Sequence, residues 1–267
     1  MRLSLIQITV GPQIEKNFEK VDKFINQALN FKPNLILLPE CFLFLSNFKK
    51  FSFSMDHEYI LHYQNFAKQN KINLLLGSLP ILDNDKVYNR SVLINHEGSI
   101  ASYYDKIHMF DVILKNNEAY KESDTYTSGS SLKIMEIDGQ LIGHSICYDL
   151  RFPKLYRELS KKSCKAIVVP SAFTYTTGKA HWHCLLRARA IENGVFILAP
   201  NQCGVNEENR STYGHSLVVN PWGEIISEAT DSEMVLNCEI DLNMVESFQN
   251  LIDPLAYFSR CWGTHQG

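Results

Sequence analysis

Residues 143–153 read Gly-His-Ser-Ile-Cys-Tyr-Asp-Leu-Arg-Phe-Pro, a short apolar run that ends in a cysteine shortly before a proline. The run up to Ile146 fits a buried strand, and Pro153 fits the first turn of a helix, where its missing N–H has no bond to lose. Cys147 is therefore predicted at the corner where the strand gives way to the helix. Backbone N–H groups at such a corner stabilise a thiolate and then an oxyanion, so we interpret Cys147 as a nucleophile.

Two other β-like runs also end in a reactive side chain. Residues 35–38 are followed by Pro39 and Glu40, and residues 101–105 are followed by Lys106. In α/β proteins the carboxyl ends of strands gather catalytic groups from distant parts of the chain. The sequence therefore predicts one pocket that holds a carboxylate, an amine and a thiol. This set suits acyl transfer through a thioester.

The neighbours of Glu40 and Lys106 predict how these charges are buried. Glu40 follows four aliphatic residues and a proline, and Phe42 and Phe44 come soon after it. Apolar surroundings disfavour a carboxylate, so we expect a raised pKa for Glu40, which suits a proton shuttle. Lys106 lies between Tyr104 and the segment 107–110, and we expect it to be partly buried.

Other interpretations of Cys147 were weighed. Buried cysteines are most often inert, small apolar side chains. A papain-like pair with His144 is disfavoured because residues three apart on a strand point to opposite faces. No cysteine-protease signature surrounds the thiol either. His144 is therefore not predicted to reach the sulfur.

The pair His181 and His183 suggests a metal site at first sight. Residues two apart on a helix do not face each other, and no third ligand is apparent in the sequence. We therefore interpret both as structural histidines and predict no metal. On the same predicted helix, Trp182 is expected in the core, and Arg189 is expected to pair with Glu192.

Length and composition predict one α/β domain over residues 1–267. The 45% hydrophobic content is ordinary for a globular core. Lys and Arg total 26 against 29 Asp and Glu, a net charge of −3. This balance excludes a basic surface for nucleic acid, so the expected partner is a small molecule.

Cysteine use and hydropathy predict the compartment. The seven cysteines are scattered, and none forms a Cys-x-x-Cys pair. The N-terminal segment lacks the features of a secretory signal, and no run reaches membrane-spanning length. We therefore predict a cytoplasmic protein with no membrane contact.

Hydrophobic periodicity predicts a β-α-β start, two hairpins and a later α/β alternation. The start comprises a strand over 3–10, a helix over 17–29 and the strand 35–38. The hairpins join 87–94 to 100–104 and 132–137 to 141–146, after a strand at 74–76. The later elements are a helix from 153, strands 166–169 and 195–199, a helix over 180–192, and strands 216–219, 224–227 and 234–240. Mixed pairing with few helices predicts stacked sheets faced by helices.

Two segments have no clear period. The polar residues 109–130 follow Lys106 directly, and long loops beside a catalytic strand end often form pocket walls. We therefore expect this segment to line the pocket. Residues 258–267 are interpreted as a tail that docks on a partner subunit.

Three motifs carry a resemblance to a known family: Leu-Pro-Glu at 38–40, Tyr-Asp-Lys-Ile-His at 104–108 and Cys-Tyr-Asp-Leu-Arg-Phe-Pro at 147–153. They resemble the signatures of the nitrilase (carbon–nitrogen hydrolase) superfamily, in the same order along the chain. Residues 170–174, 186–192 and 211–216 look like its Nit branch. The resemblance covers nearly the whole chain. It implies an α/β fold arranged as a four-layer αββα sandwich, usually a homodimer.

The resemblance also implies roles for particular residues. Glu40 is then the general base and acid, Lys106 holds the oxyanion and Cys147 is the nucleophile. Glu122 matches a second family glutamate that orients the lysine and the substrate. The mechanism that follows needs neither a metal nor an organic cofactor.

Four further residues are implied in substrate binding. Arg151 is the expected clamp for a substrate carboxylate, with a helix-start ion pair as its structural alternative. Phe173 and Thr177 match substrate-pocket positions of the Nit branch, and the Tyr148 backbone N–H is expected at the oxyanion.

Within the branch, residues 151–153 and 169–174 look more like amidases of deaminated glutathione than like omega-amidases. The expected reaction is hydrolysis of deaminated glutathione to 2-oxoglutarate and Cys-Gly, a metabolite-repair step. Two alternatives stay open at this point. One is an omega-amidase acting on 2-oxoglutaramate or succinamate, and the other is a non-catalytic binding protein on the same fold.

Overall fold

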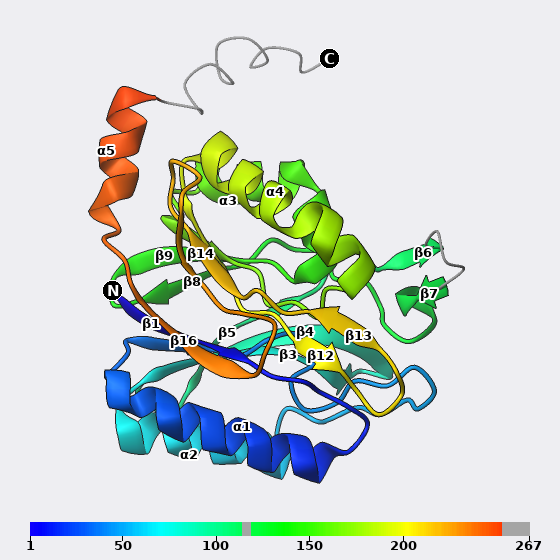
Figure 1. Cartoon of the computed structure of the whole chain (residues 1–267). Coiled ribbons are helices and arrows are strands. Elements are labelled where there is room, and N and C mark those ends of the chain that lie inside the picture. Colours follow the sequence, from blue (N-terminus) through cyan, green and yellow to red (C-terminus); the bar gives the residue numbers. More distant parts are fainter. Residues whose placement is uncertain (114–118, 253–267) are drawn as a thin grey trace.

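The computed structural model describes residues 1–113 and 119–252, which build two six-stranded sheets packed face to face (Figure 1). In spatial order the first sheet contains β16 (Met234–Glu239), β1 (Arg2–Gln7), β2 (Leu35–Leu37), β3 (Asn73–Asp83), β4 (Lys86–Ile94) and β5 (Ile100–Asp105). The second contains β15 (Ile225–Glu228), β14 (Leu217–Val219), β11 (Phe196–Ala199), β10 (Ala166–Val168), β9 (Gln140–His144) and β8 (Ile134–Ile137).

Helices cover the two outer faces. The first sheet carries α1 (Ile14–Ala28) and α2 (Glu58–Asn70), and the second carries α3 (Pro153–Lys161) and α4 (Tyr175–Asn193) (Figure 1). The predicted four-layer αββα sandwich is confirmed. A further helix, α5 (Asn243–Leu251), follows the last strand.

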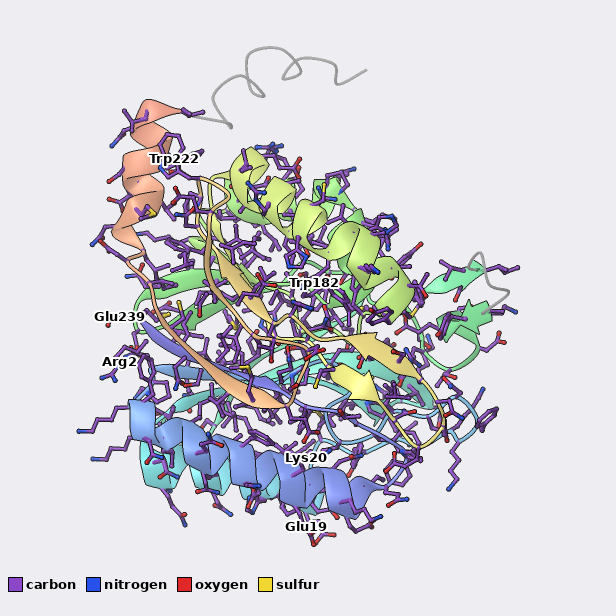
Figure 2. The ribbon with its side chains drawn as sticks, in the orientation of Figure 1. Arg2, Glu19, Lys20, Trp182, Trp222 and Glu239 are labelled. Atoms are coloured by element: carbon purple, nitrogen blue, oxygen red, sulfur yellow. The ribbon has the colours of Figure 1, made fainter. Side chains whose placement is uncertain are left out.

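Each strand of the interior is apolar on both faces because both faces are covered. In β2, Leu35 and Leu37 pack in the core between the two sheets, whereas Ile36 packs toward α1 and α2. On the other side of the molecule, Trp182 of α4 lies fully buried against the second sheet, as Figure 2 shows. The alternation of side chains along a strand thus produces three separate cores.

Strand direction brings the predicted reactive residues to one edge. β2 runs parallel to β3, and β5 also runs parallel to β3 because two antiparallel pairings, through β4, separate them. The carboxyl ends of β2 and β5 therefore lie at the same edge of the first sheet. Gly77 allows the chain before Glu40 to pack closely there, since a Cβ at Gly77 would stand 2.0 Å from the Leu38 carbonyl oxygen.

Most predicted elements are present, with several differences. Both predicted hairpins form, β4 with β5 and β8 with β9. A short 3-10 helix, η3 (Cys147–Arg151), lies between β9 and α3, and α4 begins five residues earlier than predicted. The sequence analysis missed α2, α5, and the small hairpins β6 (Asp111–Ile113) with β7 (Ala119–Lys121) and β12 (Cys203–Val205) with β13 (Ser211–Tyr213).

The missed helix α2 has a physical explanation. Its N-cap is His57, whose ring accepts the Tyr59 N–H, instead of the Ser, Thr, Asp or Asn that marks most helix starts. Three-residue strands such as β12 and β13 are too short to show a period. The predicted tail at 258–267 lies outside the described residues. Within 1–113 and 119–252, no helix combines the length and apolar character needed to cross a membrane.

Candidate active site

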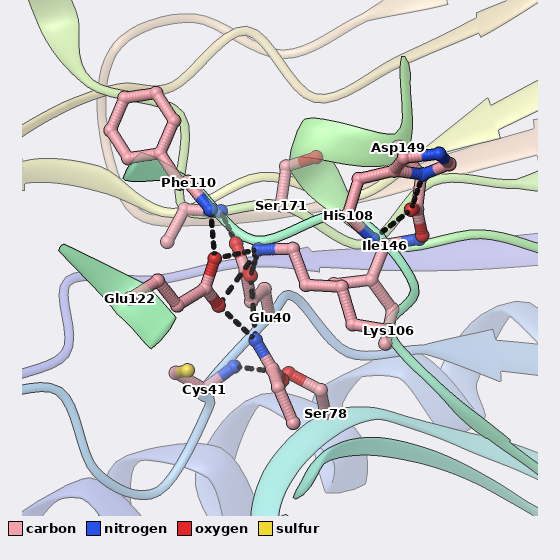
Figure 3. A network of polar contacts seen from close by, with 12 residues as sticks. Glu40, Cys41, Ser78, Lys106, His108, Phe110, Glu122, Ile146, Asp149 and Ser171 are labelled. Atoms are coloured by element: carbon pink, nitrogen blue, oxygen red, sulfur yellow. Dashed lines mark hydrogen bonds and ion pairs between the residues drawn. The ribbon is translucent and has the colours of Figure 1, made fainter. Parts of the chain in front are cut away.

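A buried lysine at the end of β5 is the centre of the site. Lys106 is 1% exposed, and its Nζ donates to Glu40 Oε1 at 2.8 Å and to both oxygens of Glu122 at 2.9 and 2.8 Å. Figure 3 shows the amine between the two carboxylates. Burial alone would lower the pKa of Lys106, but the charges of Glu122 and Glu40 raise it well above its ordinary value. The amine is therefore a permanent cation, and its predicted burial is confirmed.

Glu40 follows β2 and receives several hydrogen bonds. Besides Lys106, the Asn89 amide donates to Oε1 at 2.9 Å and the Ala172 backbone N–H donates to Oε2 at 2.8 Å. Burial pushes the pKa of Glu40 up, but Lys106, the Cys147 thiol and the Ala172 backbone N–H bring it below its ordinary value. The expectation of a raised pKa is wrong, because the apolar neighbours in sequence do not reveal the lysine opposite.

Glu122 stands in a short 3-10 helix, η2 (Glu122–Asp124), directly after β7. Its carboxylate also accepts the Phe110 backbone N–H at 2.7 Å and the Asn89 amide at 3.0 Å. Asn89 therefore bridges Glu40 and Glu122, so each carboxylate is held by Lys106 and by Asn89. This arrangement fixes the distance between the two negative charges.

Cys147 begins η3 in a left-handed backbone conformation, with φ of 44°. Such a conformation is strained for a residue with a Cβ, and it re-aims the side chain at the end of β9. The thiol is buried and lines the same cavity as Glu40. Burial and the Glu40 charge raise the pKa of Cys147 well above its ordinary value. The resting site thus holds a thiol next to a carboxylate that can take its proton.

Asp149 holds this strained turn in place. It is fully buried and accepts the Ile146 N–H at 2.9 Å, the Tyr104 hydroxyl at 2.7 Å and the His108 N–H at 3.0 Å. His108 Nδ1 lies 2.6 Å from the same carboxylate. The buried Asp149 side chain therefore joins the residue before Cys147 to the segment after Lys106.

The site opens into a cavity of about 480 Å³, which is within the range of small-molecule sites. Its wall includes Tyr148, Phe173 and Thr177, as predicted, and residues from the irregular segment 109–130. Arg151 is not among the lining residues. Its guanidinium lies over the rings of Phe173, at 5.4 Å, and Tyr148, at 5.8 Å, so it stands behind two side chains that do line the cavity.

The histidines behave differently from one another. Burial lowers the pKa of His144 to about 3, and among the described residues its ring has no hydrogen-bond partner.

The histidines of α4 contact other charged side chains. Arg151 contacts His181, with 3.3 Å between the guanidinium and Nδ1. His183 Nε2 and His215 Nδ1 each lie 2.8 Å from Glu228 Oε1, a grouping of metal-ligand type that the sequence did not reveal because the three residues are far apart. The hydrogen bonds of the two histidines to Glu228 account for this arrangement.

Comparisons with known proteins agree with this geometry. A family model described as carbon–nitrogen hydrolase matches residues 2–250. Deaminated glutathione amidase of Dictyostelium discoideum is 39% identical over 92% of this chain and 89% of its own, and omega-amidase NIT2 of Xenopus tropicalis is 34% identical over 94% and 92%. The crystal structure of Nit3 from Saccharomyces cerevisiae superposes with a TM-score of 0.84 at 30% identity, over 95% of this chain and 94% of that one. The Caenorhabditis elegans NitFhit structure gives 0.87 at 32% identity, over 94% of this chain and 63% of that one.

Fold, site and relatives together define the class of this protein: it is a hydrolase that acts on the C–N bonds of amides. The chain belongs to the carbon–nitrogen hydrolase family, as its motifs indicated. Its neighbours among solved structures include yeast Nit3, which is described as a member of branch 10 of the nitrilase superfamily.

Sequence reasoning missed several residues that hold the site together. Asn89, Asp149 and Gln202 were not singled out, although the Gln202 amide donates to the Glu40 carbonyl at 2.6 Å across 162 residues. Asp149 and the lining residue Tyr126 had no distinctive local pattern. The one available signal was the position of Asp149 inside the cysteine motif.

We expect Asp149→Asn to destabilise the protein by about 2–4 kcal/mol, because the introduced amide nitrogen would face donors that now share a buried carboxylate. Urea denaturation measures this change. Tyr104→Phe is the matched control, since it removes one hydrogen bond and keeps the charge, at a cost of about 1 kcal/mol. Equal effects of the two substitutions would contradict the assignment of Asp149 as the anchor of the turn.

Proposed function

We propose that this protein is a cysteine-dependent amidase in which Cys147, Glu40 and Lys106 carry the reaction and Glu122 orients the lysine. One observation carries the proposal: the Cys147 thiol lines one cavity with a carboxylate, Glu40, that is itself 2.8 Å from a buried ammonium. A nucleophile, a base and a cation for the developing oxyanion therefore meet in one cavity.

In the first half-reaction Glu40 takes the thiol proton, and the Cys147 sulfur attacks the amide carbon. The C=O bond becomes a C–O⁻ bond, and its negative charge is stabilised by Lys106 Nζ and by the Tyr148 backbone N–H. The N–H of Tyr148 suits this role because it lies in the first turn of η3, where helical N–H groups lack an intrahelical partner. Protonated Glu40 then gives its proton to the leaving nitrogen. The C–N bond breaks, and an amine and a thioester remain.

In the second half-reaction Glu40 is again a carboxylate and takes a proton from water. The resulting hydroxide equivalent attacks the thioester carbon, and the same oxyanion contacts act again. The C–S bond breaks, sulfur recovers its proton from Glu40, and a carboxylic acid leaves. Atoms and protons balance with water as the only co-reactant, so the proposal requires neither a metal nor an organic cofactor.

For the substrate we propose a small carboxylated amide, most specifically deaminated glutathione, which would give 2-oxoglutarate and Cys-Gly in a metabolite-repair reaction. The Dictyostelium relative, named deaminated glutathione amidase, supports this choice at 39% identity. The second candidate is an omega-amidase activity on 2-oxoglutaramate or succinamate, which relatives named omega-amidase favour. Both substrates offer the enzyme a carboxylated acyl half.

We assign the acyl half to the wall formed by Phe173, Thr177 and Tyr148. Arg151 supplies the positive charge on this side, in the same 3-10 helix as the nucleophile. Its guanidinium is held on two aromatic faces and by a 3.3 Å contact with His181, so a rotation of its side chain would be needed to reach a carboxylate in the cavity. We further propose that the chain acts as one catalytic domain, as a homodimer, in the cytoplasm.

The first measurement compares kcat/KM for deaminated glutathione with that for 2-oxoglutaramate. We expect a preference of at least about tenfold for the first, because its leaving group can make contacts that ammonia cannot. Cys147→Ala serves as the blank for contaminating activity, and Cys184→Ser, which removes an exposed thiol, is the matched control. A preference for 2-oxoglutaramate moves the assignment to omega-amidase. If neither substrate is hydrolysed, the protein is assigned as a non-catalytic binding protein on the same fold.

Substitutions of Lys106 and of Glu122 separate the role of the cation from that of the carboxylate that orients it. Lys106→Met should lower kcat by about 10²–10³, since it removes a charge from the oxyanion and leaves two carboxylates facing each other. Glu122→Gln keeps the size of the side chain and one acceptor, so a smaller loss is expected. Thermal unfolding of both variants controls for stability. A larger loss in Glu122→Gln than in Lys106→Met would contradict these roles.

The pKa directions predict a broad pH profile. Because the pKa of Glu40 lies below its ordinary 4.5, the base is present above that value and is lost only as the pH falls through the lowered pKa. Because the pKa of Cys147 lies well above 9.0, the thiol keeps its proton throughout the neutral range. We expect kcat/KM for succinamate to be flat between about pH 5 and pH 9, with circular dichroism as the control for folding. An acid limb near pH 6 would mean a raised Glu40 pKa.

A further inference from the structure

Arg210, which the sequence analysis did not single out, lines the same cavity as Cys147. Arg210 has no carboxylate within ion-pair distance among residues 1–113 and 119–252, and its Nε is buried without a hydrogen-bond partner there. One terminal nitrogen donates to Asn47 Oδ1 at 3.4 Å, and the guanidinium lies 5.2 Å from the centre of the Tyr120 ring. A partly buried cation that faces a cavity with unused donors is suited to bind an anion.

The charge of the cavity wall favours the same ligand. Lys49, Lys50 and Lys121 also line the cavity. Among the described residues the lining carboxylates are Glu40 and Glu122, and Lys106 pairs with both. Lys121 is paired with Asp124, which does not line the cavity, at 3.0 Å. The wall away from Lys106 is therefore positively charged, and it attracts anions.

The backbone at Arg210 belongs to a turn that is held by side-chain hydrogen bonds. The Asn206 side chain accepts the backbone N–H groups of Glu208 and Arg210, each at 3.0 Å, and donates to the Val10 carbonyl at 3.1 Å. The Glu208 carboxylate accepts the Ser46 hydroxyl at 2.7 Å, which joins this turn to the loop that carries Lys49 and Lys50. Arg210 and the two lysines thus belong to one connected wall.

This wall is assigned to the amine side of the reaction. The leaving nitrogen must face Glu40, which protonates it, and Cys41, directly after Glu40, lines the cavity together with Arg210. The acyl half is assigned to Phe173, which directly precedes the N-cap of α4, and Thr177, in the first turn of that helix. Groups beyond the leaving nitrogen are therefore assigned to the part of the cavity lined by Cys41 and Arg210.

We propose that Arg210, assisted by Lys49 and Lys50, binds a carboxylate on the leaving-group side of the substrate. This inference rests on the proposed amidase function and deepens it. The preferred substrates are amides whose leaving amine is an amino acid or short peptide with a free carboxylate, not amides that release ammonia. In a Cys-Gly leaving group the carboxylate lies about 7 Å from the scissile nitrogen when the chain is extended, at roughly 3.5 Å per residue.

The test compares deaminated glutathione with its C-terminal amide, which differs only in the distal charge. In the unmodified enzyme we expect kcat/KM for the acid to exceed that for the amide by about tenfold or more. In Arg210→Gln this ratio should fall close to one. Lys23→Gln, on the exposed face of α1, removes the same charge far from the cavity and should retain the original ratio. An equal kcat/KM for acid and amide in the unmodified enzyme overturns the proposal without any variant.

A binding measurement separates failure of this inference from failure of the amidase assignment. Calorimetric titration of Cys147→Ala with deaminated glutathione needs no turnover, and adding Arg210→Gln should raise Kd about tenfold for the acid only. If the unmodified enzyme hydrolyses no amide but this difference in Kd is found, the proposed function fails and the carboxylate site stands. If hydrolysis is found but the ratio of kcat/KM is unchanged in Arg210→Gln, the site fails and the amidase assignment stands.

Discussion

The site depends on a single buried ammonium. Lys106 lies almost fully out of water, and an unpaired charge in such a place is strongly unfavourable. Glu40 and Glu122 compensate it, yet together they carry one negative charge too many. The Asn89 amide and the Ala172 N–H take up the excess by donating to those carboxylates. Segments up to 132 residues apart therefore meet at one point, and removal of Lys106 would leave two buried carboxylates unpaired.

This balance also sets the protonation states from which the chemistry starts. The ammonium keeps Glu40 ionised in spite of its burial, so a base is present before any substrate arrives. Burial and the Glu40 charge in turn raise the pKa of Cys147, which therefore remains a thiol instead of an oxidisable thiolate. In the proposed mechanism the nucleophile is formed only when the Cys147 proton moves to Glu40. The strained backbone at Cys147 is compatible with this design because Asp149 anchors the turn from the far side.

The parts of the site that the sequence predicts are those that follow a strand. Glu40, Lys106 and Cys147 could be named because an apolar run directly before each one marks the strand end. Glu122 came only from the family resemblance, since the three-residue strand before it has no visible period. Asn89 and Arg210 could not be found, because their roles depend on partners in other segments. The direction of the Glu40 pKa was wrong for the same reason: the local sequence contains the apolar wall and not the cation.

The proposed acyl side and amine side of the cavity differ in how firmly the fold constrains them. The acyl side is built by η3 and the start of α4, which pack on the second sheet and share its core through Trp182 and Leu186. The amine side is built by the loop at 46–50 and the turn at 206–210, which lie outside the paired strands of both sheets. Loops of this kind can change sequence without disturbing strand order or the buried ion network. A family that keeps one acyl-transfer site can therefore vary its leaving group by altering this wall. Arg210, which has no ion pair within the described part of the chain, is the residue on which such a change would act first.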